Sequence, residues 1–450
     1  MALRICKSVL RQCLRYPVIS TLSAPLENAS LRAGCSLLLP GLSGKTVFRF
    51  TPTCFITSEA FLDRLAKGKP AGTHDGPGHY PVSVPAHGAE QLSLLLKDPD
   101  QPANPKSLKV AVIGAPNAGK STLTNQLLGR KLFAVSKKVH TTRSRALGVL
   151  TEDDTQIVLL DTPGLTTPSK VKRHHLESSL LLDPMDSLQE ADMVVVLVDV
   201  SDKWTRSRLD FEVLKCLAHN PRVPAVLVLN KVDLLKNKTA LLDITSALTE
   251  GMVNGQRLRV HSAVKPRPRQ APVRQPTPPP APTQTQDTPP GGQARRALSG
   301  EELMELKKRH GWPHFKDVFM LSAVDGEDVE TLKMYLVVAA KPGPWQYHSD
   351  VLTDQTPEDV CINTVREKLL EYLPQEVPYT MTLHIEQWTE TEQGELDISV
   401  KLHVKKDSHM RMVIGQGGHM VAKMAREAGN DLSDVFMREV RLKISAKLKH

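Results

Sequence analysis

Aromatic side chains and long apolar runs are both scarce in this chain. Phe, Trp and Tyr together make up 4% of its 450 residues. The most apolar stretches, such as Met193–Val200, are far shorter than the roughly 20 residues that a membrane-spanning helix needs. We therefore expect no transmembrane segment. Hydrophobic residues at 40% and charged residues at 24% are close to globular averages, so the chain can build a sizeable core and wholesale disorder is excluded.

Cysteine is sparse as well, and most of it lies near the N-terminus. Four of the six cysteines precede residue 55, which leaves Cys216 and Cys361 in the rest of the chain. Neither belongs to a CxxC pair or to a metal-ligand spacing. The sequence therefore predicts a reducing compartment, without a disulfide framework.

Acidic residues are nearly absent from two segments. Residues 1–50 hold seven Lys or Arg and one acid, and residues 255–300 hold eight and one. Together these segments carry +13 while the whole chain carries +9, so the remainder is −4. The basic character thus belongs to a tail and a linker, and any nucleic-acid function has to rest on a motif rather than on net charge.

The N-terminal tail has the composition of a targeting sequence. Residues 1–50 are rich in Arg and contain Ser and Leu, which is typical of a mitochondrial transit peptide, with a disordered basic tail as the alternative. Its cleavage point stays open. We expect a protein of the mitochondrial matrix, where amphipathic segments would also allow peripheral contact with the inner membrane. Residues 51–106 mix Pro, Gly and His and predict a loosely ordered extension.

Residues 107–341 predict an α/β domain. Short runs of Val, Ile and Leu alternate with helix-length segments, which is typical of a doubly wound, mostly parallel sheet. These runs are 110–113, 157–160, 193–198, 225–229 and 318–321. Residues 145–150 and 156–160 predict an antiparallel hairpin at one edge. Residues 255–300 interrupt the domain with ten prolines and almost no aliphatic residues, so they predict a disordered insertion.

Residues 345–450 predict a second, α+β unit after the boundary at Pro342-Gly343-Pro344. The pattern indicates a helix, two strands, a glycine loop that leads into a further helix, and a closing strand. The expected bounds are 359–373 for the first helix, 377–388 and 396–404 for the strands, 415–418 for the loop, about 428 for the end of the following helix, and 440–446 for the last strand.

A phosphate-binding motif follows the first predicted strand. The pattern GxxxxGK[ST] lets backbone N–H groups wrap phosphate oxygens, while the lysine adds a charge and the hydroxyl reaches Mg²⁺. The helix N-terminus adds positive potential. Its candidate residues are Gly114, Ala115, Pro116, Asn117, Ala118, Gly119, Lys120, Ser121 and Thr122.

A second motif, DTPG, ends the next long strand. Asp161 is expected to hold the Mg²⁺ shell, and the Gly164 amide to meet the γ-phosphate, with Thr162 and Pro163 between them. The following residue is Leu165, where switch GTPases often have a water-orienting glutamine. We therefore expect slow hydrolysis that depends on another group.

Two later motifs select the base. Asn230, Lys231, Val232 and Asp233 end a further strand, and the Asp233 carboxylate can accept hydrogen bonds from the ring N–H and the exocyclic amine of guanine. Adenine lacks that amine and would leave the carboxylate unpaired. Ser322-Ala323, after the 318–321 run, offers an N–H to the guanine carbonyl. The four motifs together predict GTP and GDP as ligands.

Two assignments near the phosphates stay open. Thr142 is the candidate that closes on Mg²⁺ when the γ-phosphate is present, and Thr141 competes for this role. Asn117 lies where it could help to coordinate K⁺ near the phosphates; alternatively it only stabilises the turn of the loop.

These motifs resemble those of the Era family of GTPases. The resemblance rests on GAPNAGKSTL, SKKVHTTR, DTPG followed by a hydrophobic residue, NKVD, the later SA and the glycine loop of the C-terminal unit, and it covers 108–253 and 301–450. It implies GTP hydrolysis with Mg²⁺, a C-terminal KH domain, and binding near the 3′ end of small-subunit ribosomal RNA during assembly of the small ribosomal subunit. With the basic leader, the resemblance is to mitochondrial members.

The chain departs from the family pattern at three places. Gln416 stands in the glycine loop where relatives often have a basic residue, and His140 precedes the threonine pair where they often have Gln. The insertion at 255–300 has no counterpart in compact bacterial relatives.

The glycine loop of the second unit is a candidate RNA site. A GxxG loop between two helices clamps the backbone of about four nucleotides. Residues 401–450 carry 11 basic and 5 acidic side chains, so a local basic face is expected, although a solvated surface is an equal reading for each lysine. The candidate contacts are Ile414, Gly415, Gln416, Gly417, Gly418, Lys405, Lys406, Arg411 and Lys423.

Three functions fit these motifs. The leading one is a GTP-controlled chaperone of mitochondrial small-subunit ribosomal RNA, with no DNA partner. The first alternative is a GTPase that assists tRNA modification, which would need a partner enzyme. The second is a GTP-gated RNA-binding protein with negligible hydrolysis, which Leu165 makes credible.

Overall fold

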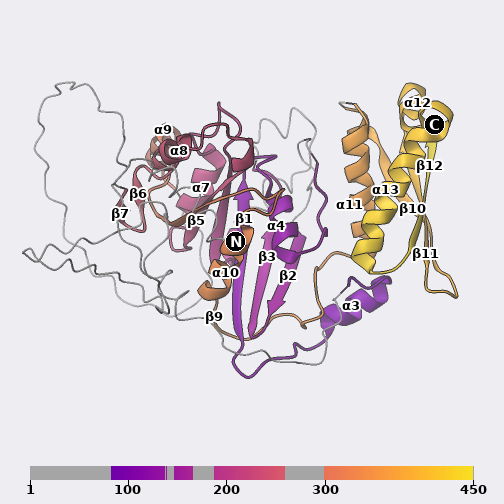
Figure 1. Cartoon of the computed structure of the whole chain (residues 1–450), viewed down its shortest axis with the longest axis horizontal. Helices are drawn as coiled ribbons and strands as arrows, with labels where there is room; N and C mark the ends of the chain where they lie inside the picture. Colours follow the sequence, from indigo (N-terminus) through magenta and orange to yellow (C-terminus); the bar gives the residue numbers. More distant parts are fainter. Residues whose placement is uncertain are drawn as a thin grey trace, which may run out of the picture.

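The computed structural model describes residues 83–136, 138, 146–165, 187–258, 298–374 and 376–448. Figure 1 shows two units side by side, a larger α/β unit and a smaller α+β unit whose helices α11 and α13 face the larger one. The predicted transit peptide, the extension up to residue 82 and the two threonines at 141 and 142 lie outside the described residues.

The larger unit is built on a mostly parallel sheet, as predicted. Its strand order is β2-β3-β1-β4-β5-β8, with β9 antiparallel at the start of β1. Only β2 and β3 form an antiparallel pair along this order, which is the predicted edge hairpin. The bounds are β1 Lys106–Gly114, β2 Ala146–Glu152, β3 Thr155–Asp161, β4 Met193–Asp199, β5 Ala225–Asn230, β8 Phe315–Leu321 and β9 Lys341–Pro342.

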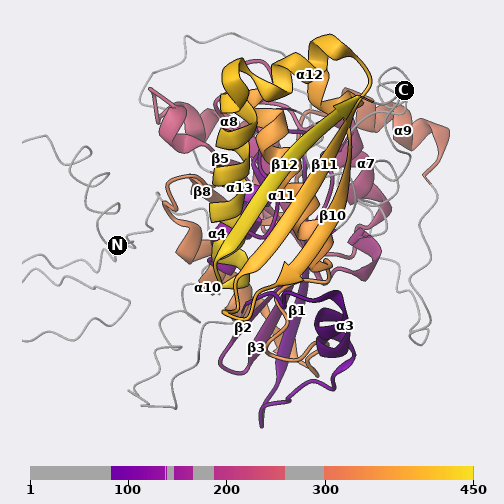
Figure 2. The same cartoon turned by 90° about the vertical axis from the view of Figure 1, so that its right-hand side faces the viewer.

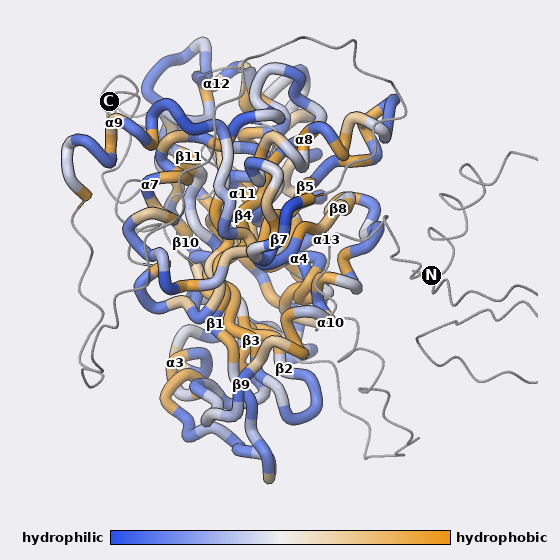
Figure 3. Tube along the Cα trace, turned by 90° about the vertical axis from the view of Figure 1, so that its left-hand side faces the viewer, coloured by the Kyte–Doolittle hydropathy of each residue, from blue (hydrophilic) through white to orange (hydrophobic). Residues whose placement is uncertain are grey.

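Helices cover both faces of this sheet because alternate residues of each strand point to opposite faces. Val110 and Val112 of β1 belong to the core beneath α4 and α10, whereas Ala111 and Ile113 belong to the core beneath α7, α8 and α9. Figure 3 shows hydrophobic residues concentrated along the central strands. The helix bounds are α4 Lys120–Leu128, α7 Phe211–His219, α8 Ala240–Leu248, α9 Gly300–Lys308 and α10 Val329–Ala339, with a one-turn helix η1 at Val232–Leu234.

The structure departs from the predicted disordered insertion at both ends of the range 255–300. Its first residues form β7 (Gln256–Arg257), which pairs with β6 (Met252–Val253) in a short hairpin. At its other end, Ser299 begins α9 with a reciprocal capping box to Glu302. Local hydrogen bonds therefore order the residues at both ends of the predicted insertion. Residues 259–297 lie outside the described part of the chain.

The smaller unit packs helices on one face of the sheet β10-β11-β12, which Figure 2 shows from its open side. Strand β10 is antiparallel to β11, and β12 is parallel to it. Along β11, buried and half-buried residues alternate strictly, as expected for a sheet covered on one face. The bounds are α11 Pro357–Tyr372, η2 Val377–Thr380, β10 Thr382–Glu390, β11 Leu396–Val404, α12 Asp407–Ile414, η3 Gln416–Gly418, α13 His419–Phe436 and β12 Val440–Leu448.

Two expected bounds of this unit are wrong. The strand expected from Val377 begins at Thr382, because residues 377–380 form a 3₁₀ turn with Pro378, which has no N–H to donate to a ladder. The helix after the glycine loop continues to Phe436 rather than about 428, because its later turns bury Leu432 and Val435 in the core.

The prediction of a loosely ordered extension is wrong for residues 83–105. Helix α3 (Gly88–Leu96) lies in this segment, and its Gln91 side chain is 3% exposed and donates to the carbonyls of Thr353 (2.7 Å) and Gln355 (3.2 Å). The Trp388 indole of β10 donates to the carbonyl of Ala86 at 2.9 Å. These bonds reach residues about 260 to 300 positions later, so composition alone could not reveal them.

Within the described residues, no helix is both long and apolar enough to cross a membrane. The two cysteines discussed above are buried, Cys216 in α7 and Cys361 in α11, and burial raises the pKa of each thiol to about 12.

Candidate functional site

The phosphate-binding motif forms the turn between β1 and α4. A Cβ atom on Gly114 would lie 2.4 Å from the carbonyl oxygen of Leu197, so only glycine fits beside β4. Gly119 has φ +97° and takes the N-cap position of α4 without a capping side chain. Asn117 also has a positive φ of 62°. The loop therefore presents backbone at the N-terminus of a helix, where N–H groups favour an anion.

Lys120 lies folded into this loop. Its ammonium donates to the carbonyls of Gly114 (3.3 Å) and Ala115 (3.1 Å), and the residue is only 6% exposed. Burial lowers the pKa of Lys120 to about 8, although the nearby Asp161 carboxylate acts in the opposite direction. The Lys120 ammonium is thus a desolvated cation within a loop whose backbone favours an anion.

The DTPG segment passes directly beside the same loop. Asp161 is fully buried at the end of β3, and the Ser121 hydroxyl donates to its carboxylate at 2.7 Å. The Leu165 N–H donates to the Gly114 carbonyl at 3.1 Å. A Cβ atom on Gly164 would lie 2.7 Å from Cα of Pro116, so this crossing requires glycine.

The side chains of Thr162 and Leu165 both anchor this segment to the rest of the domain. The Thr162 hydroxyl donates to the carbonyl of Val112 at 2.7 Å, and the Leu165 side chain is buried in the core that also contains Leu188. Leu165 therefore contributes packing and leaves no polar side chain at this position to orient water.

The predicted base-selecting residues lie at the ends of neighbouring strands. Asn230, 1% exposed, donates from its amide to the carbonyl of Ala118 (2.8 Å) and accepts from the N–H of Ala323 (3.0 Å). It therefore joins the phosphate loop to the Ser322-Ala323 loop, a link that the motif alone did not reveal. Asp233 is exposed and Val232 is buried.

Lys231 connects three of these strand ends. Its backbone has φ 65°, and its ammonium donates to the carbonyl of Asn117 (2.9 Å) and to the carboxylate of Asp199 (2.6 Å) at the end of β4. Asp199 did not stand out in the sequence. Its place at the end of a predicted strand was the only available signal.

The glycine loop of the smaller unit lies between α12 and α13. Gly415, Gly417 and Gly418 have φ of 68°, 58° and 79°, and Gly418 is the N-cap of α13 without a capping side chain. Gln416 and Gly417 are exposed. The loop thus offers a backbone conformation that favours glycine at another helix N-terminus, which favours the approach of an anion.

The predicted basic residues around this loop differ in their surroundings. Lys405 and Lys406 are exposed after β11. The Arg411 side chain is 83% exposed and lies 2.8 Å from Asp407 on the same helix. Lys423 instead turns toward α11, where its ammonium lies 4.4 Å from the centroid of the Tyr372 ring. Ile414 is half-buried at the end of α12.

Comparison with known proteins covers both units. Residues 109–231 match a family described as 50S ribosome-binding GTPase, and residues 376–450 match the KH domain family. The chain is 64% identical to the mitochondrial GTPase Era of Salmo salar and 61% identical to that of Danio rerio, over the full length of each pair.

Among solved structures, the fold resembles that of Era in complex with MgGDPNP and nucleotides 1506–1542 of 16S ribosomal RNA. The TM-score is 0.56 with 24% identity, over 77% of this chain and 94% of that one. Together, the sequence matches and the shared fold show that this chain is a GTP-hydrolysing enzyme of the Era family, with a P-loop GTPase domain followed by a KH domain.

Proposed function

We propose that this GTPase uses GTP to control its hold on the 3′ region of mitochondrial small-subunit ribosomal RNA, and thereby assists assembly of the small subunit. The observation that carries the proposal is the joining of a nucleotide loop and a KH glycine loop in one chain, each at the N-terminus of a helix. The solved Era complex with 16S ribosomal RNA supports the choice of RNA.

In this proposal, the GTPase domain binds GTP along one edge of its sheet. The backbone of 114–122 wraps the phosphates, Lys120 supplies charge, and the segment 161–165 meets the γ-phosphate. Asp233 pairs with the guanine edge. Asn230 holds two loops in place, which its bonds to Ala118 and Ala323 support.

The residues present suit Mg²⁺, which prefers oxygen ligands. The Ser121 hydroxyl and the buried Asp161 carboxylate lie 2.7 Å apart at the phosphate loop, and Thr141 or Thr142 would add a third oxygen. When bound, Mg²⁺ would neutralise developing charge on the phosphates. Asn117 would either help to coordinate K⁺ or only stabilise the turn of the loop. A comparison of GTP hydrolysis rates in K⁺ and Na⁺ buffers decides between these two roles.

The KH domain would clamp RNA at residues 414–418, with basic support from Lys405, Lys406 and Arg411. Lys423 would have to leave the Tyr372 ring to reach a phosphate. The relatives named mitochondrial support a mitochondrial protein, with residues 1–50 as its transit peptide, the matrix as its compartment and the matrix face of the inner membrane as a peripheral contact.

One observation favours the alternative of a GTP-gated RNA binder with negligible hydrolysis, namely the burial of Leu165 in the core. Multiple-turnover GTP hydrolysis that rises on addition of RNA would exclude this alternative. A rate that does not rise with saturating RNA would favour it.

The proposal is tested by UV crosslinking in intact mitochondria, with sequencing of the attached RNA, for the wild-type chain and Lys120→Ala. We expect wild-type reads to gather at the 3′ end of the small-subunit ribosomal RNA, and the variant to lose nucleotide binding while its KH domain stays folded. Reads spread over transfer or messenger RNAs would overturn the ribosomal role and leave the GTPase assignment intact.

A further inference from the structure

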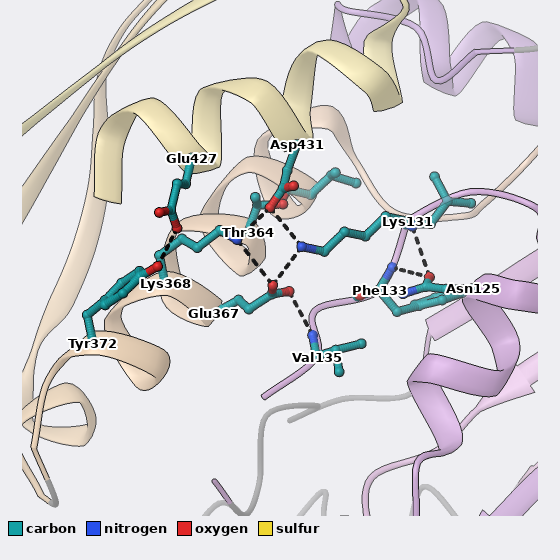
Figure 4. A network of polar contacts seen from close by, with 12 residues as sticks. Asn125, Lys131, Phe133, Val135, Thr364, Glu367, Lys368, Tyr372, Glu427 and Asp431 are labelled. Atoms are coloured by element: carbon teal, nitrogen blue, oxygen red, sulfur yellow. Dashed lines mark hydrogen bonds and ion pairs between the residues drawn. The ribbon is translucent and has the colours of Figure 1, made fainter. Parts of the chain in front are cut away.

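Four charged side chains meet where the KH domain contacts the GTPase domain (Figure 4). Lys131, which follows α4, lies 2.7 Å from Glu367 of α11 and 2.7 Å from Asp431 of α13. Lys368 of α11 lies 2.8 Å from Asp431 and 3.6 Å from Glu367. The Glu367 and Lys368 side chains are 5% and 9% exposed, so this half of the cluster is largely removed from water, whereas Lys131 and Asp431 are partly exposed.

The Asp431 carboxylate of this cluster is held in its charged form. Burial works to raise the pKa of Asp431, but the hydrogen bonds from Lys131 and Lys368 outweigh burial and keep that pKa below its ordinary value. Loss of either lysine would leave a partly buried carboxylate with fewer partners, which is costly.

Glu367 also holds the backbone of the GTPase domain. Its second oxygen accepts from the Val135 N–H at 2.7 Å, and the Lys138 ammonium donates to the carbonyl of Leu373 at the end of α11. The described residues of the segment 131–138 are therefore fixed to α11 at three of them, Lys131, Val135 and Lys138. In the sequence, only Val139 and His140 separate Lys138 from the two candidate switch threonines.

The same segment is tied to the helix that begins at the phosphate loop. The Asn125 side chain of α4 accepts from the N–H groups of Leu132 (3.0 Å) and Phe133 (2.9 Å) and donates to the Phe133 carbonyl (2.9 Å). Helix α4 starts at Lys120. The segment 131–138 is thus held between the phosphate-loop helix on one side and the KH domain on the other.

Helix α13 links this cluster to the glycine loop. It begins at that loop and carries Asp431, and the Tyr372 hydroxyl joins it to α11 through a 2.6 Å bond to Glu427. Because a helix moves largely as a rigid body, a displacement of the loop is transmitted to Asp431 and to its partner Lys131.

We propose that Glu367 is a positioning residue for the GTP site, through which the KH domain holds the segment 131–138 and reports RNA at the glycine loop to the GTPase domain. This inference rests on the proposed function, and it identifies the contacts that would couple RNA binding to GTP binding. Glu367 contacts neither nucleotide nor RNA in this scheme; it acts through Val135 and Lys131.

The test measures the coupling between RNA and GTP in the full chain. GTP affinity and the kcat and KM of hydrolysis are determined with and without a single-stranded RNA oligonucleotide from the 3′ region of the small-subunit ribosomal RNA. We expect Glu367→Ala to reduce the effect of RNA on these constants about tenfold, within the 5- to 150-fold range typical of coupled sites. RNA affinity without nucleotide should change less than about threefold.

Matched variants separate positioning from general damage. Glu212→Gln alters an ion-paired glutamate of α7, on the opposite face of the sheet, and should leave the coupling unchanged. Glu367→Gln keeps an acceptor for Val135 but loses the charge, so it should retain an intermediate coupling. Should Glu367→Ala fail to fold, Lys131→Met supplies the test, because Lys131 is 37% exposed and Lys368 still pairs with both carboxylates.

Full coupling in folded Glu367→Ala or Lys131→Met would overturn the inference while leaving the proposed function intact. A wild-type chain that binds the oligonucleotide without any change in its GTP constants would overturn both. Equal loss of coupling in Glu212→Gln would also overturn the inference, because the effect would then follow from lost stability.

Discussion

Binding of GTP should be accompanied by uptake of a proton on Lys120. In the structure this lysine is desolvated inside the phosphate loop, its ammonium donates to two backbone carbonyl oxygens, and burial lowers its pKa from 10.5 to about 8. Nucleotide phosphates would bring negative charge to the ammonium. Because a nearby opposite charge favours the charged form, the pKa of Lys120 should return toward or above its ordinary value in the complex.

The size of the effect follows from the difference in pKa. A pKa about 2.5 below its ordinary value corresponds to roughly 3 kcal/mol that disfavours the charged lysine in the nucleotide-free protein. At pH 9 only about one lysine in ten is charged in the free protein, so binding should take up close to one proton. Above pH about 8, GTP affinity should fall about tenfold per pH unit; below it, this group should contribute no pH dependence.

Isothermal titration calorimetry at pH 9 in two buffers of different ionisation enthalpy measures the proton uptake directly. Lys120→Arg serves as one control, because a guanidinium stays charged and should bind without proton uptake. Asp233→Asn serves as the other, because it should weaken binding without changing the uptake. Wild-type affinity that stays flat from pH 7 to 9.5, with no proton uptake, would refute the assignment of Lys120 as a desolvated phosphate ligand.

The remaining predictions concern the base, the frame of the site and the N-terminal segment. Asp233→Asn should lower GTP affinity by about 10- to 100-fold and improve binding of xanthosine triphosphate, which offers a carbonyl in place of the amine; equal GTP affinity in filter binding would contradict this role. Asn230→Ala should lower the free energy of unfolding by about 2–4 kcal/mol in urea, because it unpairs two buried backbone groups; a loss below about 0.5 kcal/mol would count against it. Gln91→Ala should cost about 1–3 kcal/mol and speed proteolysis of the segment 343–356, since Gln91 bonds two carbonyls there; unchanged cleavage would show that α3 does not restrain this connection.

Much of the fold could be predicted because its signals are local. The strands β1, β3, β4, β5 and β8 all lie on the short aliphatic runs, and the hairpin of β2 and β3 forms around the acidic turn at 152–154. Parallel strands bury both faces, so continuous apolar runs mark them. The architecture of the smaller unit followed in the same way from its helix, strand and glycine-loop pattern, whereas its identity as a KH domain followed from the resemblance to the Era family.

The predicted structure was wrong where contacts with distant parts of the chain, rather than local composition, determine the conformation. The segment 83–105 mixes Pro and His with a short apolar run, yet Gln91 and the backbone of Ala86 find partners in the KH domain and the connection before it. The helix α13 runs past its expected end because Leu432 and Val435 complete the KH core. The contacts of the segment 83–105 have no local pattern that would reveal them. The end of α13 does have one, because Met424, Ala428, Leu432 and Val435 recur at helical spacing.

By itself, the sequence determined which residues could meet a nucleotide, because strand, turn and helix N-terminus follow one another within a few residues in the stretches that contain Gly114 and Lys120. Only the tertiary structure decided that Asn230 bonds Ala323, 93 positions later, and that Glu367 bonds Val135, 232 positions earlier. A local motif is specified by its own backbone geometry and spacing. The pairing of distant polar groups is specified only when the chain packs and excludes water from them, within one domain for Asn230 and Ala323 and between two domains for Glu367 and Val135.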